Sequence, residues 1–89
     1  MTYPAVTSVT ALADYRLLLG FANGEQRVFE VRPYLDNGVF ADLKDVSVFR
    51  SVRVNFDTIE WANGADLCPE VLYNLGVPAS PDLAASGVG

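Results

Sequence analysis

The strongest constraint on the fold is an alternation of side-chain types early in the chain. Apolar side chains recur at every second position from Tyr15 to Phe21, a period typical of a β-strand with one buried face. Asn23-Gly24 follows, a dipeptide that tolerates the positive φ angles of a type I′ turn. Residues 26–31 then alternate again. The pattern predicts two antiparallel strands joined by a type I′ hairpin.

A second hairpin is predicted in the latter half of the chain. Residues 51–56 and 58–61 alternate on either side of Asp57, a turn-forming residue. The expected inward positions are Val52, Val54, Phe56, Ile59 and Trp61. A β-branched segment at 5–12 predicts a further strand before the first hairpin.

Helical signals lie between and after the hairpins. Pro33-Tyr34-Leu35 predicts a single helical turn. The main helix is expected over 42–50, with Asp42 or Asp45 as its N-cap. The expected apolar stripe consists of Phe40, Leu43, Val46 and Phe49, in pairs three residues apart. A short C-terminal helix is expected to start at Pro69, to bury Val71, Leu72 and Leu75, and to stop at Gly76.

These elements predict one small α+β domain over residues 1–76. Its mostly antiparallel sheet is expected to have about five strands, in two hairpins, packed with a central helix and the short C-terminal helix. Residues 77–89 are rich in Pro, Ala, Ser and Gly, without periodicity, and predict a flexible tail. The chain has 89 residues, half of them hydrophobic (51%), which suits a single core.

Charge and composition exclude several functions. The net charge is −5, and the acidity is concentrated in residues 45–89, which contain six acidic residues and two arginines. An acidic chain without a Lys/Arg run repels phosphate backbones, so we expect no direct nucleic-acid binding. No apolar run is long enough for a membrane span, and no signal peptide is visible. Together with the single cysteine, Cys68, these features favour a cytoplasmic protein.

Residues for catalysis or metal binding are scarce. Histidine is absent, which removes the commonest general base and any histidine-ordered triad. Cys68 stands near a helix start without a His or Lys beside it, and a structural or incidental role is favoured. The aspartates lack the spacing of a calcium loop, and the single-glycine turns do not match a phosphate-binding loop. We therefore predict no enzyme activity, no cofactor and no metal site.

The stretch from Trp61 to Tyr73 is the best candidate for a binding surface. It holds the only Trp and the only Cys, and Trp61 and Tyr73 each carry a polar atom that favours a part-exposed position. The candidate partner-contact residues are Arg53, Glu60, Trp61, Asn63, Asp66 and Tyr73. The alternative interpretation is that this corner only seals the end of the sheet.

Several segments, in this order, resemble one bacterial family. They include Phe21-Ala22-Asn23-Gly24-Glu25, Ile59-Glu60-Trp61 and Asn63 through Tyr73. The series resembles domain-of-unknown-function family 2442 over about residues 3–75. The resemblance implies a small α+β domain without an established enzymatic activity. Some members carry a helix-turn-helix, and others resemble one half of a two-gene pair similar to toxin–antitoxin modules. No helix-turn-helix follows the domain here, and we do not expect the DNA-binding role.

The favoured hypothesis is a non-enzymatic protein-interaction module with a small, basic protein partner, the antitoxin-like half of a pair being one form of it. One alternative is a small-ligand binder or a carboxylate-based enzyme with a pocket near Trp61 and Asp66. Another is an accessory to a DNA-binding regulator. A homodimer through an unpaired edge strand is a further open alternative.

Overall fold

The computed structural model describes residues 3–79 and has the predicted α+β class. The strands are β1 (Val6–Leu12), β2 (Arg16–Phe21), β3 (Gln26–Glu30), β4 (Arg53–Asn55), β5 (Thr58–Glu60), β6 (Asp66–Leu67) and β7 (Val77–Pro78). The 3₁₀ helices are η1 (Ala13–Tyr15), η2 (Arg32–Tyr34) and η3 (Gly38–Lys44), and the α-helices are α1 (Val46–Phe49) and α2 (Pro69–Leu75). The predicted single turn after Pro33 is confirmed as η2.

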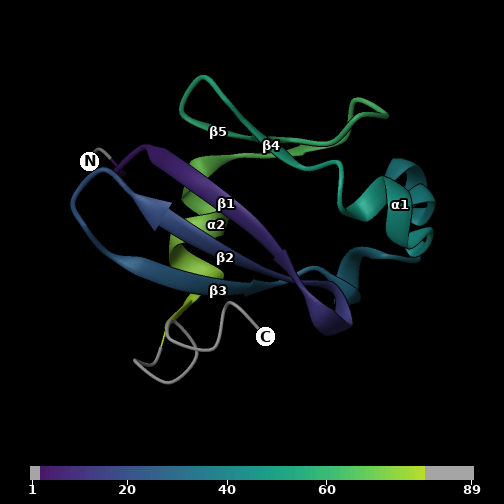
Figure 1. The fold of residues 1–89 in the computed structure, drawn as a ribbon, viewed down its shortest axis with the longest axis horizontal. Coiled ribbons are helices and arrows are strands. Elements are labelled where there is room, and N and C mark those ends of the chain that lie inside the picture. Colours follow the sequence, from purple (N-terminus) through teal and green to yellow (C-terminus); the bar gives the residue numbers. More distant parts are fainter. Residues whose placement is uncertain (1–2, 80–89) are drawn as a thin grey trace.

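The strands form two antiparallel sheets rather than one. The first has the order β1-β2-β3-β7 and the second the order β4-β5-β6. In Figure 1, α2 crosses behind the first sheet, β4 and β5 lie beyond β1, and α1 stands at one end. The prediction of about five strands was too low because β6 and β7 have two residues each, too few to show an alternation.

The first hairpin is confirmed, with Leu17, Leu19 and Phe21 buried, but its turn is not type I′. Only Gly24 in the loop has a positive φ, 89°. The Gly24 N–H donates to the Phe21 carbonyl (2.9 Å) and the Phe21 N–H to the Glu25 carbonyl (2.9 Å). This is a three-residue loop ending in a left-handed glycine. The same bonds recur in the loop between Trp61 and Ala65, where Gly64 has φ 88°.

The predicted helix at 42–50 is wrong in its length. The segment splits into η3 and the four-residue α1, because Asp45 between them has an extended backbone (φ −72°, ψ 116°). The Asp45 carboxylate accepts from the Ser47 N–H (2.9 Å), so Asp45 is the N-cap that its residue type predicts. Phe49 is buried, but Val46 is 55% exposed and lies outside the expected stripe.

The second hairpin is confirmed, with one residue misplaced. Ile59 and Trp61 are buried, as predicted, but Phe56 is 94% exposed. Asn55 pairs with Thr58, so Phe56 and Asp57 form the two-residue turn. The strand therefore ends at Asn55, one residue before the end of the alternating sequence pattern that predicted an inward Phe56.

The C-terminal part packs on the first sheet. Helix α2 starts at Pro69 and buries Leu72, whereas Leu75, expected inside, is 60% exposed. Val77 and Pro78 pair with β3, and the Ala79 N–H donates to the Gln26 carbonyl (2.9 Å). Since Val77 and Pro78 belong to the sheet, the predicted domain boundary at residue 76 is too early; residues 80–89 of the predicted tail lie outside the described residues.

The core lies between the two sheets and α2. Its fully buried side chains come from β1, β2, β3, η3, β5 and α2 and from the residues that directly follow β3 and β5, and the largest are Trp61, Phe29, Leu17, Leu19, Leu43, Ile59 and Leu72. No buried polar or charged residue occurs among residues 3–79. Within the same range, no helix is long and apolar enough to cross a membrane.

Candidate functional site

The six predicted contact residues occupy four separate places. Arg53, Glu60 and Asp66 form one row across the second sheet, where Glu60 pairs with Arg53 of β4 and with Asp66 of β6. Glu60 lies between the inward residues Ile59 and Trp61, so the row faces away from the core. The Arg53 guanidinium lies 3.3 Å from the Glu60 carboxylate, and the Asn55 amide donates to the same oxygen (2.9 Å). Arg53, Asn55, Glu60 and Asp66 are named the polar row.

Trp61 is part of the core, and the prediction that it is part-exposed is wrong. Its side chain is 1% exposed, and its indole N–H donates to the Phe49 carbonyl (3.0 Å). That one bond satisfies the only polar atom of the indole, which removes the reason for the ring to reach solvent. A partner cannot reach the Trp61 side chain in this conformation.

Asn63 holds its own loop and a neighbouring segment. Its carbonyl oxygen accepts from the Ala65 N–H (3.1 Å). Its amide donates to the Val39 carbonyl (3.1 Å) and to an Asp42 carboxylate oxygen (3.2 Å). Since both ends of the side chain are hydrogen-bonded within the domain, Asn63 is a structural residue that ties the loop after β5 to η3.

Tyr73 lies on α2, against the first sheet. Its ring meets Phe21 edge to face (5.2 Å between centroids), and the Arg27 guanidinium lies over it at 3.9 Å. Arg27 also donates to the Tyr73 carbonyl (2.8 Å) and lies 2.9 Å from the Glu25 carboxylate. The Tyr73 hydroxyl donates to Glu25. Arg27, Glu25 and Tyr73 are named the α2 latch, because they fasten the helix to the first hairpin.

The latch perturbs one titratable group. Hydrogen bonds donated by Tyr73 first, then by Asn23 and Arg27, hold the pKa of the Glu25 carboxyl below its usual value. Each of these bonds favours the charged form of the carboxyl. The hydrogen bonds of the latch to Glu25 are therefore strongest when its carboxyl is ionised.

The residue that sequence reasoning missed is Phe56. It is 94% exposed and has φ 59°, in the left-handed region. The turn is fixed to the first sheet, since the Val6 N–H donates to the Asp57 carbonyl (2.9 Å). In Figure 1 the turn between β4 and β5 lies at the margin of the molecule, beyond β1. The sequence contains one signal for this exposed position. Asp57 is a turn-forming residue, so the chain is expected to turn next to Phe56.

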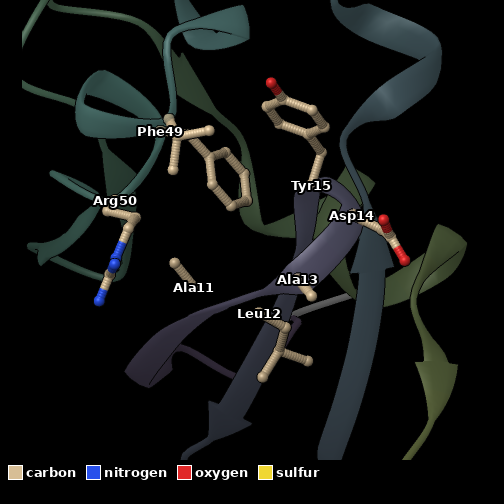
Figure 2. A pocket seen from close by; sticks show the side chains of 8 residues that line it. Ala11, Leu12, Ala13, Asp14, Tyr15, Phe49 and Arg50 are labelled. Carbon is tan, nitrogen blue, oxygen red and sulfur yellow. The ribbon is translucent and has the colours of Figure 1, made fainter.

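A pocket is present, although not at the predicted corner near Trp61 and Asp66. It has a volume of about 260 Å³ and lies between the end of β1, η1 and α1. Its lining residues are Ala11, Leu12, Ala13, Asp14, Tyr15, Val46, Phe49 and Arg50. Figure 2 shows the Phe49 ring, Ala11 and Leu12 around its centre, with Arg50 on one side. We name it the β1–α1 pocket.

The backbone beside this pocket is strained. Asp14 and Tyr15 both have φ 60°, a conformation that is unusual for a bulky residue such as tyrosine. Tyr15 is held from two directions: its hydroxyl donates to the Lys44 carbonyl (2.5 Å), and its ring meets Phe49 edge to face (5.2 Å). These contacts fix the turn after β1 to α1, and so set the width of the pocket.

Side chains suited to covalent or metal chemistry do not gather at the Phe56 turn or at the β1–α1 pocket. Cys68 is exposed at the start of α2. Within residues 3–79, no three Asp, Glu or Cys side chains lie close enough to hold a metal ion together. The arrangement offers two features for binding, the exposed Phe56 turn with the polar row and the β1–α1 pocket.

Comparisons with known proteins give one match. No curated protein and no solved structure matches the chain. One family model, described as "Protein of unknown function (DUF2442)", matches residues 6–78, which span all seven strands and both α-helices. The resemblance noted in the sequence is thereby confirmed, and the chain belongs to the DUF2442 family.

Proposed function

We propose that this domain is a non-enzymatic protein-interaction module of the cytoplasm, which docks a protein partner on the β4–β5 hairpin. Phe56 is the apolar anchor of the contact, and the polar row is its rim. The observation that carries the proposal is the state of Phe56, a large aromatic side chain 94% exposed on a left-handed backbone. Both properties are unfavourable for folding, and neither serves the core.

The backbone of Phe56 makes this argument quantitative. A left-handed conformation costs an L-residue about 1–2 kcal/mol, and the first position of a two-residue hairpin turn with positive φ favours glycine. Strained residues are concentrated at ligand-binding and switching positions. Aromatic side chains are also enriched among the residues that dominate binding energy at protein interfaces. Phe56 therefore combines a folding cost with a side chain suited to binding.

The charges around the hairpin favour a basic partner. Glu60 and Asp66 in the polar row and Asp57 in the turn are acidic, and Arg53 is the only cation of this group. Complementary charge steers association and suppresses wrong partners. A two-protein pair of the toxin–antitoxin kind, implied by the family resemblance, is one setting in which a small basic partner occurs. In this proposal the complex weakens as salt concentration rises.

Phe56→Gly tests the proposal without endangering the fold. Glycine takes up a positive φ without strain, so the variant should be no less stable than the wild type in urea unfolding. Tagged wild type, Phe56→Gly and Leu75→Ser would be used for affinity capture from source cells, followed by quantitative mass spectrometry. Leu75 is the matched control, because it is an exposed apolar residue (60%) on α2.

The expected result is a small basic protein captured stoichiometrically by the wild type and by Leu75→Ser, and reduced at least tenfold with Phe56→Gly. Equal capture by all three proteins would contradict the placement of the contact on the hairpin. Nucleic acid detected by absorbance only where a DNA-binding protein is captured together with the domain would instead favour the role as accessory to a DNA-binding regulator.

A further inference from the structure

We infer that the β1–α1 pocket is a binding site for a small organic carboxylate with an apolar body. Arg50 binds the carboxylate, and the apolar body lies against the Phe49 ring. The site is on a different face from the Phe56 turn and is independent of the protein contact proposed above.

The charge argument rests on Arg50. The chain has six cationic side chains, and five of them have a carboxylate within 4.0 Å: Arg16, Arg27, Arg32, Lys44 and Arg53. Among the described residues, Arg50 alone has none, in a chain whose net charge is −5. A guanidinium at the rim of a pocket, without a carboxylate partner among residues 3–79 of so acidic a protein, matches an anionic ligand.

The other charged residue of the pocket does not neutralise Arg50. The Asp14 carboxylate lies 3.6 Å from the Arg32 guanidinium and 4.0 Å from that of Arg16. In Figure 2 it points away from Phe49 and Arg50. Arg50 is therefore the charged side chain of the pocket lining that no carboxylate of the described residues balances within 4.0 Å.

The walls define the rest of the ligand. The apolar residues of the pocket lining include Ala11, Leu12, Val46 and Phe49. Val46 is 55% exposed, so packing in the core does not account for an apolar residue at this position. A ligand against Val46 and Phe49 would remove that apolar surface from water. The volume of about 260 Å³ is just below the range of about 300–1,000 Å³ typical of sites for drug-sized ligands. The size suits a ligand of about ten non-hydrogen atoms.

The strand edge supplies further polar groups. The Phe21 N–H donates across the first hairpin to Glu25, and directions alternate along an antiparallel strand. Arg16 and Leu18 therefore direct their backbone groups to β1, where they pair with Leu12 and Thr10. Ala11, between these two, directs its N–H and carbonyl to the open edge of the sheet. Because Ala11 lines the pocket, these groups can bind a polar atom next to the carboxylate.

The test uses phenylacetate, which has an apolar ring and a carboxylate, and its neutral analogue phenylacetamide. Each is titrated into ¹⁵N-labelled protein, and amide shifts are followed. Phenylacetate should bind with a Kd on the order of 1 mM and shift the amides of Ala11, Val46, Phe49 and Arg50. Phenylacetamide should bind at least tenfold more weakly.

Arg50→Gln should weaken phenylacetate binding at least tenfold. Lys44→Gln is the matched control, because its exposed ammonium pairs with Asp36 and does not line the pocket, and it should leave binding unchanged. Equal binding of acid and amide, shifts elsewhere on the protein, or full binding by Arg50→Gln would each overturn the assignment. None of these results depends on whether a protein docks at Phe56.

Discussion

At the scale of single residues, Trp61 has the largest structural role. Its ring is buried between the two sheets, and its indole N–H supplies a hydrogen bond to the end of α1, at Phe49. The same residue that sequence reasoning placed in a contact surface thus joins the second sheet to the segment that walls the pocket. Its polar atom serves the fold rather than a partner.

Trp61→Phe is predicted to destabilise the domain by about 2 kcal/mol, because it leaves the Phe49 carbonyl without its donor and removes part of a buried ring. Urea unfolding, followed by circular dichroism, measures the change. The loss of the donor should also increase amide hydrogen exchange in α1. A change below about 0.5 kcal/mol would show that the bond and the packing are not important to the fold.

Glu25 gives a pH-dependent prediction. Its pKa is lowered in the folded protein, chiefly by the hydrogen bond from Tyr73, so its contribution to stability is present above the unfolded pKa and is lost as the pH falls through the folded value. Glu25→Gln should therefore be less stable than the wild type at pH 7, and the stability difference should shrink steadily as the pH falls below about 4. Tyr73→Phe should raise the Glu25 pKa, measured by ¹³C NMR. A constant stability difference from pH 7 to pH 3 would argue against the latch.

The periodicity of apolar residues predicted part of the observed pattern of buried side chains. Leu17, Leu19, Ile59 and Trp61 are buried where the period of two places them. Phe56 follows the same period and is exposed, because hairpin closure between Asn55 and Thr58 overrides a pattern of apolar residues. The pairing is a contact between two strands, and it cannot be predicted from the pattern of residues along one of them.

At the scale of elements, the two Asn-Gly loops are built alike. In each, the asparagine oxygen accepts from the N–H two residues later, Glu25 or Ala65, and the glycine takes the positive φ. The dipeptide predicted both turns, but it did not distinguish a two-residue from a three-residue loop. The one-turn α1 and the two-residue β6 and β7 were not predictable, because such short elements depend on tertiary contacts.

Gly76 shows why α2 ends where it does. A Cβ at this position would lie 2.6 Å from the Leu72 carbonyl oxygen and 3.1 Å from the Arg27 Cβ. Gly76→Ala is therefore predicted to cost about 1–3 kcal/mol in urea unfolding. The control is Gly20→Ala, whose new methyl group would meet the Ser8 hydroxyl, a side chain that can rotate away. Equal costs for the two variants would mean that the close approach of α2 to β3 is not a constraint.

At the scale of the whole molecule, two small sheets enclose one core. Two of the connections between their strands form the candidate binding features on the surface. The β4–β5 turn is attached to β1 through Val6 and carries Phe56. The turn after β1 is attached to η3 and to α1 through Tyr15, and it borders the pocket. Neither feature follows from composition or spacing, because each arises where segments far apart in the sequence meet. The fold class could be predicted from the sequence, whereas the candidate sites required the structure.

The measurement that tests the central claim most directly is the amide spectrum of ¹⁵N-labelled domain in clarified lysate of its source cells. The wild type should lose signal selectively at residues 53–60 and at Asp66, because exchange between the free and bound states broadens the amides at the contact. Phe56→Gly should keep those signals in the same lysate. Identical spectra for the two proteins, or broadening centred on another face, would contradict the claim that Phe56 anchors a protein partner.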